Sequence, residues 1–287
     1  MSKGRLRIGA DEDNLSPAPI FQDPNYSQSL ERGLAILGCF TLERPALGIA
    51  EIAQDLGMSR STTHCYVITL LALGYLEQGA SRKYRLGVRV TDLGMSALST
   101  TGLREHSHSY LEELRQRTSY TVNLAVLDGP EILDVDRARS FRRGQSKIDF
   151  GLARGSRLPA YCTAMGKLLL AFLPEYEQCS LIAAMELSKR GPNTITSKRG
   201  LRGELEHVRE EGFAVNDQEF ASGLYSISAP VRSISREVVG AVNMAAHSSM
   251  ISLEKLVDQL GPHLVSIADR ISARIGSRRD DELNGSR

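Results

Sequence analysis

Two short helical patterns joined across Gly57, Met58 and Ser59 constrain the fold of this chain more than any other feature. In the first, apolar residues recur at helical spacing over residues 49–56, and Gly57 then favours a helix end. In the second, Ser59 is a good N-cap, and Val67 lies on a buried face that continues up to Gly74. Two short helices with a tight turn between them predict a helix-turn-helix.

The flanking segments extend this unit into a winged module. Residues 26–40 show helical spacing, with Ser27 or Ser29 as the N-cap. After the second helix, residues 75–77 and 83–86 are typical of two short strands, and Gly79 lies in the loop between them. The sequence therefore predicts three helices followed by a β-hairpin.

The second helix and the hairpin carry the residue types that DNA recognition needs: short donors and acceptors near a helix N-terminus, and cations for phosphates. The alternative for the helix is an ordinary solvated start. The hairpin has basic residues without an intervening acid, which favours DNA contact. The predicted DNA-binding residues are Ser59, Arg60, Ser61, Thr62, Thr63, Tyr66, Arg82, Lys83 and Arg85.

The remainder of the chain alternates strands and helices. Strands are expected at 121–127, 132–139, near 148, 213–215, 226–231 and 238–246, and helices at 106–118, 163–172, 175–185 and 198–211. An amphipathic helix runs from Leu253 to Ile271, and Gly261 with Pro262 predicts a kink in it. The expected fold class is mainly α plus α+β. The domains are a disordered arm at 1–23, a winged helix-turn-helix at 24–88, a linker helix at 89–104, an effector-binding domain at 105–276 and a flexible tail at 277–287.

Composition excludes several classes of protein. With 41% hydrophobic residues and 35 Lys+Arg against 34 Asp+Glu in 287 residues, the chain matches a globular protein of two domains. It contains neither a membrane-length apolar run nor an apolar leader, so we expect a cytoplasmic location and no membrane partner. The four cysteines are far apart and form no C-x-x-C pair, so neither a disulfide framework nor a zinc cluster is expected. No metal and no cofactor are predicted.

Several motifs in order resemble the IclR family of transcriptional regulators. The winged-helix half is matched by residues 28–34 (QSLERGL), 56–62 (LGMSRST) and 84–87 (YRLG). The effector half is matched by residues 158–167 (LPAYCTAMGK), 216–219 (NDQE) and 223–227 (GLYSI), so the resemblance covers about residues 25–275. The sequence of residues 159–163 (PAYCT) most resembles that of the branch that controls aromatic-acid breakdown through the β-ketoadipate pathway.

The resemblance implies a one-component bacterial regulator that binds palindromic double-stranded operator DNA as a dimer or dimer of dimers. It also implies a GAF-like effector domain whose pocket lies between the sheet and the loop before the helix that starts at Thr163. In that pocket, backbone groups of Ala164 and Met165 at a helix N-terminus favour a carboxylate. The effector-binding residues implied are Thr163, Ala164, Met165, Asn216, Leu224, Ser226 and Asn243. Many family members have Asp at position 216, Cys at 226 and Ser at 243.

Arg137 is a further candidate, drawn from the residues themselves. An alternation of period two places four side chains on one strand face: Leu133, Val135, Arg137 and Arg139. An arginine on an inward face is a candidate bidentate carboxylate clamp. The alternative is a surface charge on an edge strand, near Arg142 and Arg143. The predicted effector is therefore a small carboxylated compound, either aromatic or from the β-ketoadipate pathway.

The alternative function is an enzyme or a thiol redox sensor with an appended DNA-binding module. Cys162 precedes a predicted helix, whose N-terminus can lower the pKa of a thiol. A base is also needed, and the spacing of His207 and His247 makes neither a partner. No phosphate-loop, G-x-S-x-G or H-E-x-x-H pattern is present, so the chain is predicted not to be an enzyme.

Overall fold

The computed structural model describes residues 25–41, 44–79, 81–94, 103–141 and 152–284. The chain divides into two compact units, Met1–Gly94 and Met95–Arg287. The division falls inside the segment predicted as a linker helix, of which residues 89–94 are helical and 95–102 lie outside the described residues. The predicted arm at 1–23 and the predicted strand near residue 148 also lie outside them.

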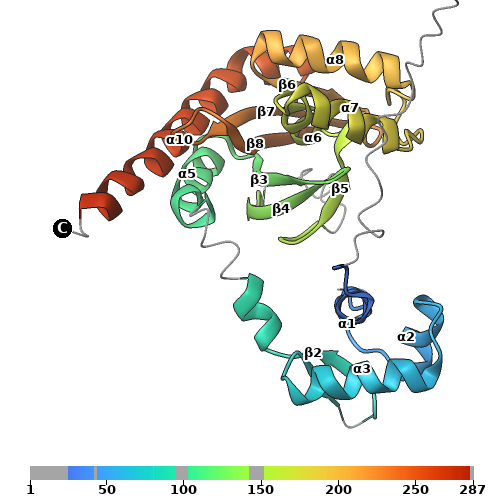
Figure 1. The fold of residues 1–287 in the computed structure, drawn as a ribbon. Coiled ribbons are helices and arrows are strands. Elements are labelled where there is room, and N and C mark those ends of the chain that lie inside the picture. The colour runs from blue at the N-terminus through green and yellow to red at the C-terminus, as the bar shows by residue number, and fades with distance from the viewer. Residues whose placement is uncertain (1–24, 42–43, 80, 95–102, 142–151, 285–287) are drawn as a thin grey trace, which may run out of the picture. The chain divides into compact units, whose positions relative to one another are not determined.

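The first unit is a winged helix-turn-helix. Its elements are α1 (Gln28–Gly38), α2 (Ile49–Asp55), α3 (Arg60–Ala72), β1 (Leu76–Gln78) and β2 (Tyr84–Leu86) (Figure 1). Ser27 caps α1, and the Ser59 hydroxyl caps α3 by accepting the Thr62 N–H at 3.1 Å. Gly57 has a φ of 62°, which is the left-handed conformation that suits glycine after a helix. The predicted helices, turn and hairpin are confirmed.

A small apolar core holds these elements together. It is formed by Ile36, Phe40, Leu47, Ile52, Val67, Leu76 and Tyr84. Leu47 also forms a β-bridge with Tyr84, which ties the segment before α2 to the hairpin. The hairpin is therefore anchored to the helices and not merely attached at their end.

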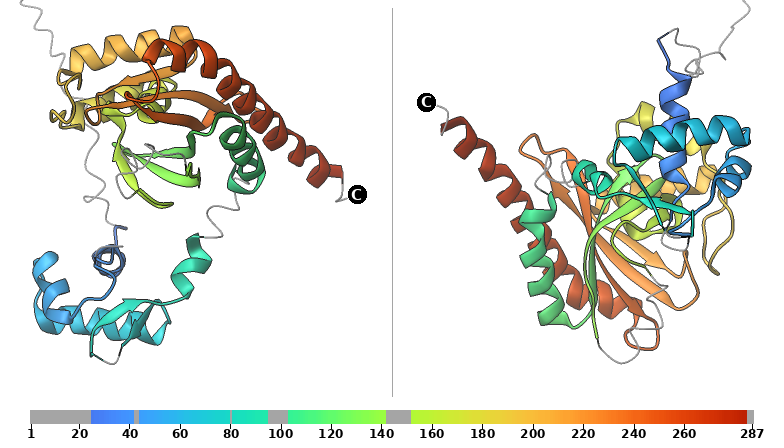
Figure 2. Two further views of the ribbon diagram at one scale, coloured as in Figure 1. Left: turned by 180° about the vertical axis from the view of Figure 1, so that it is seen from behind. Right: turned by 90° about the horizontal axis from the view of Figure 1, so that it is seen from below.

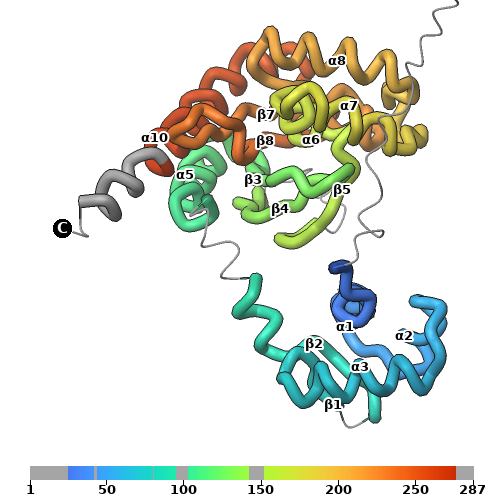
Figure 3. Tube along the Cα trace, in the orientation of Figure 1, coloured from blue at the N-terminus to red at the C-terminus, as the bar shows by residue number. Residues whose placement is uncertain are grey.

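The second unit contains a six-stranded antiparallel sheet in the order β5-β4-β3-β8-β7-β6. The strands are β3 (Thr121–Asp128), β4 (Glu131–Ala138), β5 (Arg157–Pro159), β6 (Ala214–Asp217), β7 (Leu224–Arg232) and β8 (Val238–His247). Figure 3 traces the path of the chain through them. Strand β5 was not predicted, because its three residues at the sheet edge are too few for an alternation to show.

Helices surround this sheet. They are α5 (Leu103–Thr118), the 3₁₀ turn η3 (Ala160–Cys162), α6 (Ala164–Ala171), α7 (Glu175–Ala184), α8 (Lys198–Glu211), α9 (Leu253–Lys255) and α10 (Gly261–Asn284). A π-helical segment, η4 (Leu256–Leu260), precedes Gly261 and Pro262, where a kink was predicted. The tail was predicted to start at residue 277, but α10 continues to Asn284. Within the described ranges, no helix is long and apolar enough to cross a membrane.

The two faces of the sheet are covered by different helices. Helices α5 and α10 pack on one face, and α6 with α8 behind it covers the other (Figures 1 and 2). Leu124 and Val242 face the α5 side, while Ala125 and Ala241 face the α6 side, as the strand alternation requires. On the α6 side, the alternating positions towards one end of the strands are polar instead of apolar: Thr121, Asn123, Asn243, Ser226, Ser228 and Asn216.

A β-bulge in β4 changes which of its side chains share a face. Asp134 pairs with Ala125 and Asp136 pairs with Leu124, so Val135 has no partner residue in the register. Leu133 and Val135 pack into the core beneath α5 and α10. Arg137 faces the opposite side, so the prediction that it shares a face with them is wrong. The extra residue shifts the period-two pattern by one position.

Candidate effector pocket and DNA-binding surface

The first turn of α3 presents most of the predicted DNA-binding residues, with one correction. Ser59, Arg60 and Ser61 are exposed, and Thr62 and Tyr66 are partly exposed. Thr63, in contrast, is fully buried, and its hydroxyl donates to the Ser59 carbonyl at 3.0 Å. Its predicted contact with DNA is therefore wrong, because Thr63 lies one turn before Val67 on the core face of the helix.

The outward face of α3 is formed by other residues, most of which sequence reasoning missed. Exposed positions recur at helical spacing along one side of the helix, away from the core: Ser61, His64, Cys65, Ile68 and Ala72. We call these five residues the outward face of α3. Their spacing of three and four residues along one side of the helix was visible in the sequence.

The hairpin was predicted to form an uninterrupted positive edge, but two of its three cations are paired with carboxylates. Lys83 lies 3.1 Å from Glu51 of α2, and Arg85 lies 2.8 Å from Glu77 of β1. Arg82 is exposed in the loop with a φ of 58°. All the ion-paired groups are partly exposed, so DNA phosphates can compete for these cations, but the acids reduce the net charge of the edge.

In the second unit, the predicted effector residues converge on one cavity. Eight come from β4, α6 and its cap, β6, β7 and β8: Arg137, Thr163, Ala164, Met165, Asn216, Leu224, Ser226 and Asn243. Thr121, Asn123, Leu152, Leu158, Phe220 and Ala245 complete the lining. The cavity has a volume of about 50 Å³, counted as the space that the centre of a water molecule can occupy. By the same measure one water needs roughly 10–15 Å³, so the cavity is several times larger than that. The cavity lies between the sheet and the N-terminus of α6.

A row of polar side chains crosses the floor of the cavity. Arg137 on β4 is opposite Asn123 on β3, which in turn is opposite Asn243 on β8. Asn123 and Asn243 are 6% and 4% exposed, and within the part of the chain that the structure describes, neither side-chain oxygen has a hydrogen-bond partner. Buried carbonyl oxygens of this kind normally accept a hydrogen bond. Asn123 was missed, although the alternation Thr121, Asn123, Ala125 indicated its face.

The guanidinium of Arg137 approaches a buried carboxylate. Its Nη1 lies 3.8 Å from Oδ2 of Asp134, and the two side chains are 8% and 3% exposed. Burial raises the pKa of Asp134 to about 7, with the charge of Arg137 opposing the rise. The predicted alternative, a surface charge at an edge, does not describe Arg137: its side chain is buried and lines the cavity.

The N-terminus of α6 is held closely against the preceding turn. The Thr163 hydroxyl accepts the Gly166 N–H at 3.2 Å, which caps the helix. A Cβ on Gly166 would lie 2.2 Å from the Ala160 carbonyl oxygen, so only glycine fits there. Ala164 and Met165 occupy the first turn, whose amides lack intrahelical acceptors, and both line the cavity.

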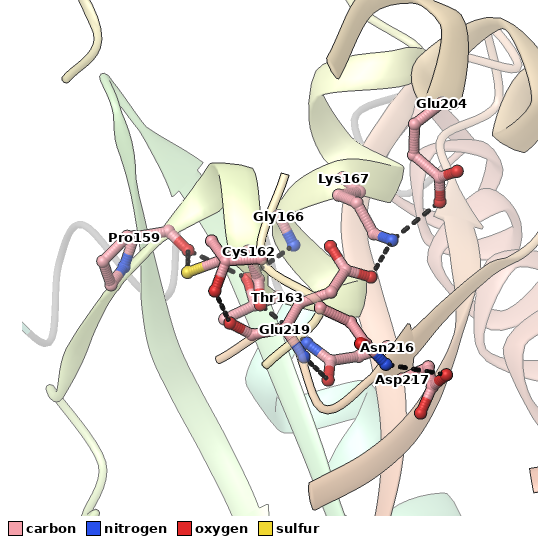
Figure 4. Close-up of polar contacts among 11 residues, drawn as sticks. Pro159, Cys162, Thr163, Gly166, Lys167, Glu204, Asn216, Asp217 and Glu219 are labelled. Atoms are coloured by element: carbon pink, nitrogen blue, oxygen red, sulfur yellow. Dashed lines mark hydrogen bonds and ion pairs between the residues drawn. The ribbon is translucent and has the colours of Figure 1, made fainter. Parts of the chain in front are cut away.

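A buried network joins the cavity wall to α6 and α8 (Figure 4). Asn216 donates to the Cys162 carbonyl at 2.6 Å and accepts the Glu219 N–H at 3.2 Å. The Lys167 ammonium, 1% exposed, lies 2.5 Å from Glu219 and 2.7 Å from Glu204. Lys167 was not predicted to be a network residue, because a lysine in an otherwise apolar helix usually lies at the surface.

Cys162 lacks the features of a reactive thiol. Its side chain is fully buried, and burial raises its pKa to about 11. The thiolate is therefore scarce near neutral pH, contrary to the expectation that the helix N-terminus lowers this pKa. His207 lies exposed on α8, and His247 contacts Ser249. Among the described residues, no cluster of three His, Cys, Asp or Glu side chains could hold a metal ion.

Comparisons with known proteins agree with both units. Residues 29–80 match the IclR helix-turn-helix domain, and residues 95–273 match the bacterial transcriptional regulator IclR C-terminal domain. The chain is 32% identical to the Pca regulon regulatory protein of Pseudomonas putida (88% of this chain, 86% of the relative). It is 31% identical to the p-hydroxybenzoate hydroxylase transcriptional activator of Acinetobacter baylyi (86% of this chain, 91% of the relative).

A solved structure shows the same fold. An IclR homolog from Microbacterium hydrocarbonoxydans, complexed with 4-hydroxybenzoate, has a TM-score of 0.75 at 24% identity, covering 86% of this chain and 98% of its own. The curated relatives are transcriptional regulators and not enzymes, which disfavours the catalytic alternative. A DNA-binding winged helix and an effector-type domain, each matched by its own family model, establish the conclusion: this chain belongs to the IclR family of bacterial transcriptional regulators.

Proposed function

We propose that this regulator binds a palindromic operator and that a small carboxylated aromatic compound in the pocket controls its binding. One observation carries the proposal: residues from distant parts of the sequence form a single buried cavity with an arginine, two helix N-terminal amides and three amide side chains. A cavity with a few convergent polar groups is the usual form of a small-molecule site.

The lining defines the chemistry of the ligand. Arg137 and the amides of Ala164 and Met165 bind its carboxylate. Leu224 packs against its ring, and Ser226 or Asn243 accepts hydrogen bonds from its hydroxyl groups. The regulators of the Pca regulon and of p-hydroxybenzoate hydroxylase support an aromatic acid, and the Microbacterium homolog supplies 4-hydroxybenzoate as the first probe.

On DNA, α3 enters the major groove of each half-site. Ser59, Arg60, Ser61, Thr62 and Tyr66 contact bases or phosphates, and Arg82, Lys83 and Arg85 contact the backbone. Two such heads require a dimer or a dimer of dimers. Leu93 is 54% exposed and follows Val90 on the helical turns at 89–94, so this apolar stripe offers a pairing surface.

The ligand controls DNA binding if its affinity differs between the DNA-competent state and the other state of the dimer. Couplings of this kind are typically about 1–3 kcal/mol, which changes operator affinity by roughly five- to 150-fold. Operator binding measured with and without 4-hydroxybenzoate gives this coupling directly.

Calorimetry tests the pocket with 4-hydroxybenzoate, protocatechuate, β-ketoadipate and the two aromatic carboxamides. We expect at least one acid to bind and the carboxamides to bind poorly. Arg137→Gln should weaken the acid by at least about tenfold, since a charge-assisted hydrogen bond contributes roughly 1.5–3 kcal/mol. Arg157→Gln is the matched control, because Arg157 lies on β5, pairs with Asp128 and does not line the cavity. Carboxamides that bind as well as the acids would overturn the anion clamp.

A further inference from the structure

The outward face of α3 becomes apolar after its first turns, whereas the solvent-facing side of a helix is normally polar throughout. Ile68 is 43% exposed, and Cys65 and Ala72 lie beside it, one turn apart along the same side. A different side of the helix buries Val67 in the core. Helix α3 is thus apolar on two sides, whereas a surface helix usually pairs one apolar stripe with a polar face.

The charges on α3 are compatible with DNA as the occupant of this face. Residues 60–72 include Arg60 and no Asp or Glu, so nothing on the helix repels phosphates. Ser61 and His64 precede the apolar residues along the same side. The side therefore carries hydrogen-bonding groups in its first turns and aliphatic or thiol groups after them.

We propose that Cys65 and Ile68 contact thymine methyl groups, and that each operator half-site has A·T pairs beneath the second turn of α3. The C5-methyl of thymine is the apolar group that base pairs present in the major groove, so it is the natural partner of these side chains. Ser61 and His64 contact the adjacent base edges. The inference rests on the DNA binding proposed for α3 and adds the bases that it reads.

Selective thiol labelling tests the contact on the wild-type protein. Cys65 and Cys179 are both exposed, one in each unit, whereas Cys162 is buried. The probe is the best duplex that the wild-type protein selects from a random library, and N-ethylmaleimide labelling is followed by peptide mass spectrometry. Excess duplex should abolish labelling of Cys65 and leave Cys179 unchanged. Continued labelling of Cys65 in the saturated complex would overturn the proposal.

Uracil substitution tests the methyl groups themselves. Replacing the half-site thymines with uracil removes only those methyl groups, and each lost contact should weaken wild-type binding by about fourfold, the factor for one buried methyl group. Ile68→Ala should lose the preference for thymine over uracil at one position. Leu73→Ala is the matched control, because Leu73 is 49% exposed in the same domain and lies off this face. Equal uracil sensitivity in both variants contradicts the proposal.

The outcomes separate this inference from the proposed function. If the protein selects no duplex, DNA binding itself fails. If a duplex is selected but uracil has no effect and Cys65 remains reactive, operator binding stands and the thymine contact is wrong. If Cys65 is protected before DNA is added, in proportion to protein concentration, a second copy covers the face and the inference is also wrong. Thermal melting confirms that the Ile68→Ala and Leu73→Ala proteins are folded.

Discussion

Arg137, which lines the cavity, and Asp134 lie on the same side of β4, with Arg137 Nη1 and Asp134 Oδ2 separated by 3.8 Å and both side chains nearly buried. At this separation the interaction is electrostatic and not a formed hydrogen bond. A carboxylate ligand at Arg137 therefore brings a second negative charge close to Asp134. The affinity of Arg137 for that ligand therefore depends on whether Asp134 is protonated.

The protonation of Asp134 should appear in the stability of the protein. Burial raises its pKa to about 7, above the value of about 3.9 for an exposed Asp, so the folded state binds a proton that the unfolded state releases in between. The stabilisation is complete below about pH 4 and is lost as the pH rises through about 7, by at most roughly 1.4 kcal/mol per pH unit. Asp134→Asn should flatten this slope in urea unfolding series. Parallel curves for the two proteins would contradict the assignment.

Ligand binding should also take up a proton near pH 7. A bound carboxylate raises the pKa of Asp134 further, because like charges disfavour the ionised form. The affinity for 4-hydroxybenzoate should therefore fall as the pH rises from about 6.5 to about 8.5. Calorimetry in buffers with different ionisation enthalpies measures the proton uptake. Asp134→Asn should remove it, and a buffer-independent heat in the wild type would count against this mechanism.

Glu51 should weaken DNA binding through Lys83. Its carboxylate accepts the Gly48 N–H at 2.7 Å and pairs with Lys83, and these contacts lower the pKa of Glu51. Glu51→Gln keeps a capping side chain but frees the Lys83 ammonium, so affinity should rise for all DNA sequences alike.

Lys83→Ala should make the slope of log affinity against log salt shallower by about one. An unchanged slope removes Lys83 from the footprint.

Two helical glycines should respond oppositely to alanine. At Gly166 the new Cβ would lie 2.2 Å from the Ala160 carbonyl oxygen, so Gly166→Ala should cost about 1–3 kcal/mol of stability or more and displace the α6 N-terminus. At Gly203 on α8 nothing lies within 4 Å, so alanine should stabilise by about 0.5–1 kcal/mol. Thermal melting compares the two. A neutral Gly166→Ala protein would show that the turn can yield.

Assembly should depend on the stripe at the end of the first unit. Leu93 is 54% exposed, and an aspartate there would place a charge in an apolar pairing surface. Sedimentation of the wild type at micromolar concentration should show a dimer or a dimer of dimers, and Leu93→Asp should shift it towards smaller species. A wild-type monomer with full operator affinity would refute the paired-head arrangement.

Local signals predicted much of the fold. Ser59 as an N-cap and Gly57 as a left-handed terminator act within a few residues, so the helix-turn-helix could be predicted from spacing alone. The α8 bounds, Lys198–Glu211, match the predicted helix for the same reason: Gly212 ends it with a φ of 77°. Apart from Arg137, the predicted pocket residues came instead from matched motifs, because strand pairing across distant segments has no local signal.

Two of the missed features depend on contacts between distant segments. Glu51 pairs with Lys83 across 32 positions, so the neutralised hairpin edge could not be seen in the basic run itself. Lys167 finds its carboxylates on α8 and in the loop after β6. Thr63 was the exception: the spacing from Val67 already placed it in the core, and the prediction followed its residue type instead.

The bulge in β4 determines which of its side chains reach the pocket. Because Val135 is the skipped residue, pairing the same residues without the bulge would restore a simple alternation and turn either Arg137 or Leu133 to the opposite face. An arginine would then enter the layer beneath α5, or a leucine would enter the polar cavity. Substitutions at Arg137, Asn123 and Asn243 would change the chemistry of the pocket within an unchanged strand register, whereas loss of the bulge at the same strand length would change which side chains reach the pocket at all.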